Sequence, residues 1–232
     1  MVSAVNNIDY LLDSSPWMKY LKDNQADRVR SSMHSQSYET GALVCHKGDP
    51  TNMWVGICDG LVKLSVSAAD GKQVSLATGI PKGSWFGEGS LLKREPRKYD
   101  VIALRKSVVA FMPDETFFWL LDVSIQFNQF LLNQLNERLG QFIGNMEHQR
   151  LLLPEARVAR ALASMFHPQL YPRASDEIKL SQQELGDLSG ISRQRVNKAL
   201  SVLQALNIVD IEYGTIKVLN FEALSNFNPD EI

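Results

Sequence analysis

Three cations lie close together near the carboxyl-terminal end of a chain whose overall charge is slightly acidic. Arg193, Arg195 and Lys198 have no acidic residue between them, whereas the 232-residue chain has 24 Lys+Arg against 26 Asp+Glu. Because the chain has no global excess of positive charge, any polyanionic partner must be bound by a local patch. We therefore take this cluster as a candidate surface for contacts with nucleic-acid phosphates and bases.

The residues before the cluster predict two helices joined by a tight turn. Ser181 followed by Glu184 forms a capping box, which begins a helix. Gly186 allows a second helix to approach closely, and Gly190 suits a left-handed backbone position in the turn. Ser192 can cap the helix that follows. Together these signals predict a helix–turn–helix.

A wheel of the second helix at 100° per residue separates an apolar side from a polar one. The side expected to pack on the preceding helix holds Val196, Ala199, Leu200, Leu203 and Leu206. The candidate DNA-binding residues are Ser192, Arg193, Gln194, Arg195, Asn197, Lys198 and Ser201. Arg pairs with guanine and Asn or Gln with adenine, whereas Arg195 and Lys198 are expected to contact phosphates. A basic helix face that is merely solvated remains an alternative.

The rest of the chain must position this helix. Along the chain, the pattern of apolar and turn-forming residues changes at three points. Residues 6–35 look helical with a break near Ser14–Pro16, and residues 41–113 read as short strands between turns, typical of a small β-barrel or roll. The expected strands are 53–57, 61–67, 73–77 and 98–111, with a hairpin turn at Asp70-Gly71. After a long helical region, the tail "IVDIEYGTIKVLN" predicts a β-hairpin behind the helix–turn–helix. The fold class is therefore α+β.

The long helical region carries an apolar seam. From about residue 114 to 148 there is no proline, and a heptad pattern is formed by Ile125, Leu132, Leu135, Leu139, Phe142 and Met146. Asn128 is a polar residue within this pattern. A seam of this length predicts a homodimer through residues 125–146, although a helix packed on its own domain is the alternative. Pro154 then begins a new helix. We expect a β-roll domain with amino-terminal helices at 1–123, a dimerisation helix at 124–153 and a winged helix-turn-helix domain at 154–232.

This arrangement resembles the cyclic AMP receptor protein/FNR family of bacterial transcription regulators. The segments that carry the resemblance are "LSQQELGDLSGISRQRVNKALSVLQALNIV", "GALVCHKGDPTNMWVGICDGLVKLS" and "FGEGSLLKREPRKYDVIAL". The resemblance implies a cyclic-nucleotide-binding-like β-roll, a long dimerisation helix and a DNA-binding winged helix. It also implies a sequence-specific regulator that binds a near-palindromic duplex, and RNA polymerase is a candidate partner.

The same resemblance implies an effector site. In the phosphate-binding cassette, Gly87 and Glu88 match the family pattern, and Glu88 would take a ribose hydroxyl. Backbone N–H groups near Gly89 and Ser90 would face a phosphate, which Arg97 would pair with. Two departures stand out: Lys98 replaces a hydroxyl residue after the arginine, and Phe142 with Ile143 replaces the Thr-Ser pair that reaches adenine in cyclic-AMP-responsive members. The candidate effector residues are Gly87, Glu88, Gly89, Ser90, Arg97, Lys98 and Phe142, and the ligand would be cyclic AMP or another small anion.

Other function classes lack support in the sequence. No nucleophile–base motif, metal-ligand spacing or nucleotide loop points to an enzyme. Cys45 and Cys58 are too few for a disulfide framework, and the cysteine cluster of an iron–sulfur sensor is missing. No run of about 18 apolar residues indicates a membrane span, and no signal peptide is evident, so we expect a cytoplasmic protein. The competing reading is a ligand-binding module whose winged helix docks on protein rather than DNA.

Overall fold

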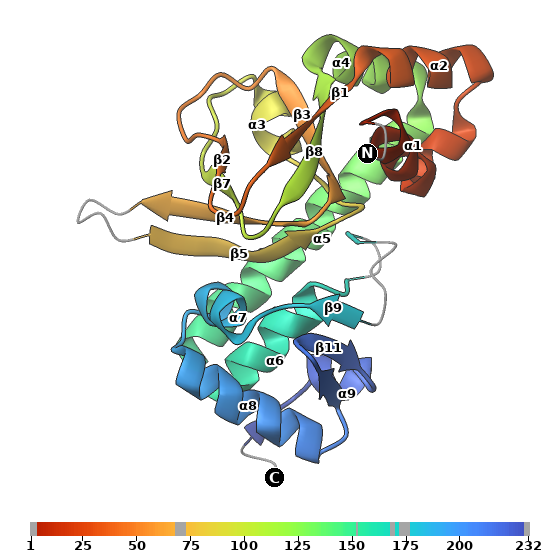
Figure 1. Cartoon of the computed structure of the whole chain (residues 1–232). Coiled ribbons are helices and arrows are strands. Elements are labelled where there is room, and N and C mark those ends of the chain that lie inside the picture. Colours follow the sequence, from red (N-terminus) through yellow and green to blue (C-terminus); the bar gives the residue numbers. More distant parts are fainter. Residues whose placement is uncertain (1–3, 68–72, 152, 168–169, 172–176, 230–232) are drawn as a thin grey trace.

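The computed structural model describes residues 4–67, 73–151, 153–167, 170–171 and 177–229. A β-roll with flanking helices forms one end of the molecule, and a smaller helical body with a short sheet forms the other (Figure 1). One long helix, α5, runs diagonally from the first body to the second. The expected α+β class with these three parts is confirmed.

The amino-terminal segment is helical and broken where the sequence predicted. It comprises α1 (Ala4–Ser14), the 3-10 helix η1 (Pro16–Tyr20) and α2 (Asp23–Ser32). The hydroxyls of Ser14 and Ser15 donate to the Leu11 carbonyl at 2.6 and 2.9 Å, and Pro16 then begins the next helix. The prediction of helix up to residue 35 is wrong at its end, because residues 34 and 35 already pair in a strand.

The β-roll consists of two four-stranded antiparallel sheets, with strand orders β1-β8-β3-β6 and β2-β7-β4-β5. The strands are β1 (His34–Tyr38), β2 (Leu43–Cys45), β3 (Met53–Asp59), β4 (Leu61–Ser67), β5 (Gln73–Pro81), β6 (Trp85–Phe86), β7 (Asp100–Ala103) and β8 (Ser107–Pro113). A six-residue helix, α3 (Glu88–Lys93), follows β6. The hairpin turn predicted at Asp70-Gly71 lies outside the described residues, although β4 and β5 on either side of it pair antiparallel.

The single strand predicted over residues 98–111 is wrong, because the chain changes sheet within it. β7 pairs with β2 and β4, whereas β8 pairs with β1 and β3. The corner is held by Leu104, whose N–H donates to the Leu61 carbonyl at 2.9 Å. Gly60, with φ of +95°, lies so close to Ser107 that a Cβ would meet its hydroxyl oxygen at 2.3 Å. Only glycine fits there.

Two helices follow the roll, α4 (Asp114–Val123) and α5 (Ile125–Leu151). Their junction at Ser124 is bridged by Asn128, whose amide donates to the carbonyls of Leu121 and Ser124 at 2.7 and 3.0 Å. The face of α5 toward the roll buries Phe127, Leu131 and Gln134. The opposite face exposes large apolar side chains, namely Ile125, Leu132, Leu139, Phe142 and Ile143. The predicted seam is thus mostly on the surface of the single chain, while the side chain of Met146 lies outside the description.

The carboxyl-terminal body is a winged helix. It contains α6 (Pro154–Ser164), β9 (Glu177–Lys179), α7 (Gln182–Ser189), α8 (Arg193–Ala205), β10 (Val209–Glu212), β11 (Thr215–Val218) and α9 (Phe221–Ser225). The three strands form one sheet in the order β10-β11-β9. The predicted hairpin turns at Tyr213 (φ 48°) and Gly214 (φ 79°), and two positive φ values in succession are typical of a type I′ turn.

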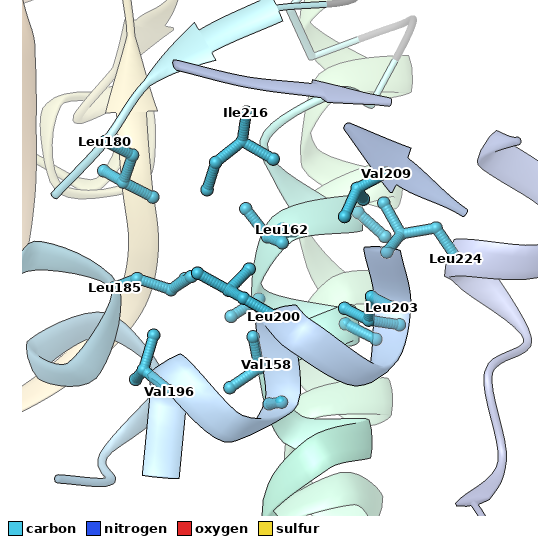
Figure 2. Close-up of a cluster of buried hydrophobic side chains, with 14 of the residues drawn as sticks. Val158, Leu162, Leu180, Leu185, Val196, Leu200, Leu203, Val209, Ile216 and Leu224 are labelled. Carbon is cyan, nitrogen blue, oxygen red and sulfur yellow. The ribbon is translucent and has the colours of Figure 1, made fainter. Parts of the chain in front are cut away.

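Apolar side chains from every helix of this body meet in one core. Figure 2 shows Val158 and Leu162 of α6 facing Leu185 of α7 and Leu200 and Leu203 of α8. Leu206, expected in this core, is instead 41% exposed just after α8. The core also extends across to the β-roll, because it includes Leu61 of β4.

Candidate DNA-recognition helix and effector cassette

The helix–turn–helix is built by the local signals that predicted it. The Ser181 hydroxyl accepts from the Glu184 N–H at 3.2 Å, and a Glu184 carboxylate oxygen accepts from the Ser181 N–H at 2.7 Å. A Cβ on Gly186 would meet the Ile191 carbonyl oxygen at 2.9 Å, so glycine lets the turn pass close to α7. Gly190 ends α7 in the left-handed conformation with φ of 69°. These contacts fix the angle at which α8 leaves the turn.

α8 presents one polar and one apolar face, as the wheel predicted. Val196, Ala199, Leu200 and Leu203 are buried against α6 and α7. The side chain of Ser192 caps the helix by accepting from the Arg195 N–H at 3.4 Å. All the candidate DNA-binding residues are exposed, namely Ser192, Arg193, Gln194, Arg195, Asn197, Lys198 and Ser201. The structure therefore brings the whole predicted set to one surface at the edge of the molecule (Figure 1).

The cations of this surface are not neutralised by the chain's own acids. Within the described part of the chain, no ion pair involves Arg193, Arg195 or Lys198. The amide of Asn197 is held by Gln182 of α7, which donates to its side-chain oxygen at 3.0 Å. A helix start also carries partial positive charge from its free N–H groups. The amino-terminal half of α8 is therefore an exposed, uncompensated positive surface.

The cassette belongs to the β-roll, where the chain passes from β6 into α3. Gly87 begins α3 in the left-handed conformation, with φ of 90°, and a Cβ there would lie 3.1 Å from an Arg97 guanidinium nitrogen. Gly89 faces open space. Arg97 is buried at 6% exposure, and its guanidinium donates to the Met53 carbonyl at 3.0 Å. Gly87 and Arg97 are thus neighbours, as the sequence pattern implied.

Glu88 has a partner that the sequence analysis missed. Its buried carboxylate pairs with Arg138 of α5 at 2.8 Å, and Arg138 also donates to the Trp85 carbonyl. The signal was present in the spacing of Phe127, Leu131, Gln134 and Arg138, which are three or four residues apart and share the inner face of the helix. The other oxygen of Glu88, Oε2, is buried and has no hydrogen-bond partner among the described residues.

Two predicted effector residues do not join this cluster. The Lys98 side chain is 63% exposed and pairs with Glu95 at 2.8 Å, and this hydrogen bond lowers the pKa of Glu95. Phe142 is 56% exposed on α5, outside the groups of side chains that pack in the cores. Two residues after Lys98, at the start of β7, Asp100 accepts from the Lys47 N–H at 2.8 Å and pairs with His46 at 2.7 Å. Ser90 is half-buried on α3.

The described residues contain no cluster of three or more His, Cys, Asp or Glu side chains able to hold a metal ion. Searching the same residues for a helix long and apolar enough to cross a membrane also finds none.

A β-roll with a phosphate-cassette turn, a long helix and a winged helix defines a class of two-part regulators. Family models agree on both parts: a cyclic nucleotide-binding domain matches residues 35–124, and a Crp-like helix-turn-helix domain matches residues 156–227. The chain belongs to the Crp/Fnr family of transcription regulators.

The chain is similar over most of its length to curated and solved members. It is 23% identical over 226 residues to the cAMP-activated global transcriptional regulator CRP of Haemophilus influenzae, covering 94% of this chain and 98% of that one. It is 26% identical over 192 residues to the regulator of the same name from Pasteurella multocida, covering 81% and 91%. The structure of FixK2 from Bradyrhizobium japonicum superposes with a TM-score of 0.68 at 20% identity, covering 84% of this chain and 97% of that one.

Proposed function

We propose that this regulator acts as a homodimer that inserts one α8 helix per subunit into successive major grooves of a near-palindromic duplex. The observation that carries the proposal is the exposed positive surface at the start of α8, whose cations have no acidic partner in the described chain. In this division of labour, residues 1–123 sense the signal, 124–153 dimerise and 154–232 bind DNA. A two-fold dimer requires half-sites about 34–36 Å apart, one turn of the duplex.

The residues of α8 divide into two kinds of contact. Arg193 and Gln194 lie at the start of the helix, where side chains of a recognition helix meet base edges, and Asn197 follows one turn later. Ser192, Arg195, Lys198 and Ser201 are suited to phosphate oxygens, which set register without reading sequence. Asn197 must exchange its bond with Gln182 for an adenine edge, because that bond occupies its side-chain oxygen.

The apolar stripe on α5 supports the dimer. Ile125, Leu132 and Leu139 are spaced by sevens and are 70%, 66% and 57% exposed. Large apolar side chains repeated in this way are stabilised by a second helix bearing the same stripe. A parallel pair of α5 helices also places both copies of α8 at the same end of the dimer, one on each side of the two-fold axis.

Two measurements test the proposal together. Leu139→Glu should convert the dimer to monomers in light scattering, because it places two like charges in the seam. Asn133→Glu is the matched control, since Asn133 is exposed on α5 about 100° around the helix from Leu132. Duplex affinity should fall as salt rises, with a slope set by the number of phosphates contacted.

A winged helix that docks on protein rather than DNA is the alternative. In that case duplex binding would be absent or independent of salt, and Leu139→Glu would not change it. RNA polymerase is proposed as a further partner of the DNA-bound dimer, to be tested by polymerase retention on a promoter duplex.

For the effector we propose a small anion of the cyclic-nucleotide type at the cassette. Glu88 Oε2 is a buried acceptor without a partner in the described chain, which suits a ligand hydroxyl. Arg97 is close to Gly87 and can turn its guanidinium from the Met53 carbonyl to a phosphate. Lys98 and Phe142 would need to move to contribute, so the cassette supports the class of ligand and not cyclic AMP in particular. We further propose that the protein is cytoplasmic and has no enzymatic activity.

A further inference from the structure

Two residues of the carboxyl-terminal body are buried inside the β-roll. Leu170 and Tyr171 follow α6 in the chain, yet they are 2% and 3% exposed within the core group that fills the roll. The other members of that group include Cys45 of β2, Phe86 of β6 and Val101 of β7. The side chains of Leu170 and Tyr171 therefore complete the interior of a domain whose strands all lie before residue 114 in the sequence.

Tyr171 lies at the cassette. Burial raises the pKa of the Tyr171 phenol, and the charges of Arg138 and Glu88 also act on it. Tyr99 shares these surroundings: burial, together with Glu88, raises the pKa of its phenol to about 12. Tyr171 is also packed in the same buried group as Phe86, the residue just before the cassette turn at Gly87. We therefore take its ring to lie next to the cassette, within range of the charges of the Glu88–Arg138 ion pair.

Leu170 and Tyr171 are held by His167, which lies three residues after the end of α6. The Tyr171 N–H donates to the His167 carbonyl at 2.8 Å, and the Leu170 N–H donates to the His167 Nδ1 atom at 3.3 Å. Because Nδ1 accepts, the ring proton of a neutral imidazole is on Nε2, which lies 3.2 Å from the Glu137 carboxylate of α5. His167 therefore links Leu170 and Tyr171 to the long helix.

We propose that Leu170 and Tyr171 form a built-in occupant of the effector site, which a cyclic nucleotide must displace in order to bind. This rests on the proposed function in one respect, the assignment of the cassette as the effector site. Displacement removes the attachment of the winged-helix body to the roll that Leu170 and Tyr171 provide. A separate attachment remains in the packing of Leu188 on Gly79 and Leu61, next to the Arg105–Glu184 ion pair. Binding of ligand would thus loosen the hold on the DNA-binding domain.

The two free cysteines provide a direct test, because they lie in different cores. Cys45 belongs to the group that Leu170 and Tyr171 complete, whereas Cys58 belongs to the tryptophan-rich group on the other face. In Leu170→Asp and in the milder Tyr171→Ala, iodoacetamide should label Cys45 at least tenfold faster than in the wild type, with Cys58 unchanged. Tyr171→Phe keeps the ring and should keep Cys45 protected.

An unchanged labelling rate of Cys45 in both variants would overturn the proposal that Leu170 and Tyr171 occupy the site. Faster labelling of both cysteines in Leu170→Asp would indicate general unfolding. In that case the proposal is tested by the labelling rates of Cys45 and Cys58 in the milder Tyr171→Ala variant. Competition is measured by calorimetry with cyclic AMP as the probe: its Kd for Tyr171→Ala should be at least tenfold lower than for the wild type. Equal affinities, including no binding by either protein, would refute the competition. Neither measurement contains DNA, so a failure to bind duplex would refute the proposed function without touching this inference.

Discussion

The polar face of α8 and the cassette both contain charged side chains, but among the described residues these are exposed and unpaired on α8 and buried and paired in the cassette. The cations of α8 are exposed and have no acidic partner in the described chain. In the cassette, Glu88 and Arg97 are buried and already engaged, with Arg138 and with the Met53 carbonyl. Exposed, unpaired charge is available to a partner without any rearrangement, whereas buried, paired charge stabilises the free protein and must be released first. The first surface is ready for its ligand, and the second is already filled.

The largest effect is expected where a buried pair is broken. Arg138→Met leaves Glu88 as a buried charge without a partner and should lower the free energy of unfolding by about 3–5 kcal/mol. This change in the free energy of unfolding is measured by urea unfolding, followed by tryptophan fluorescence. Trp54 and Trp85 stack with their ring centroids 4.1 Å apart.

The matched control is an exposed pair. Lys98→Met removes the partner of Glu95 at the surface and should leave the free energy of unfolding unchanged. If both variants lose stability equally, the distinction between the buried and the exposed charges does not hold.

A smaller effect is expected at α8, and it should appear in binding instead of stability. Arg193→Ala should cost about 1–3 kcal/mol on a duplex selected for tight binding and should relax the base preference. Lys198→Ala should weaken all duplexes alike and lower the salt slope by about 1. Gel-shift titrations at several salt concentrations separate the two. A uniform loss from Arg193→Ala would mean that this arginine positions the helix without reading bases.

The smallest effect is expected at Asp100, at the edge of the cassette, and it depends on pH. The hydrogen bond from the Lys47 N–H holds the pKa of Asp100 below its usual value. A carboxylate with a lowered pKa stabilises the fold above the pKa of the unfolded chain, about 3.9, and loses that contribution as the pH falls. Asp100→Asn should therefore cost about 1 kcal/mol at pH 7, with the difference disappearing as the pH falls through the lowered pKa of Asp100. A difference that persists in acid would indicate a packing defect.

The helix–turn–helix was predictable because its determinants are local. The capping box of Ser181 and Glu184, the close approach at Gly186 and the turn at Gly190 each depend on neighbours only a few residues away. For the same reason, the break before Pro16 and the hairpin of the wing were found from short stretches of sequence.

Features fixed by long-range contacts were missed. The change of sheet between β7 and β8 depends on pairing with strands elsewhere in the chain, and so does β9, a strand of three residues that pairs with the distant β11. The partner of Glu88 is 50 residues away in the sequence. Nothing local marks Tyr171 as part of another domain, since an apolar residue in a proline-rich loop suits many environments.

The length of α5 has a mechanical consequence. A helix of 27 residues is about 40 Å long. Tilting such a rod by about 5° at the roll would carry its far end through roughly 3.5 Å, close to the rise of about 3.4 Å between neighbouring nucleotides on one strand. A tilt of a few degrees would therefore move the end of α5 that leads into the winged helix by about the spacing of one base step.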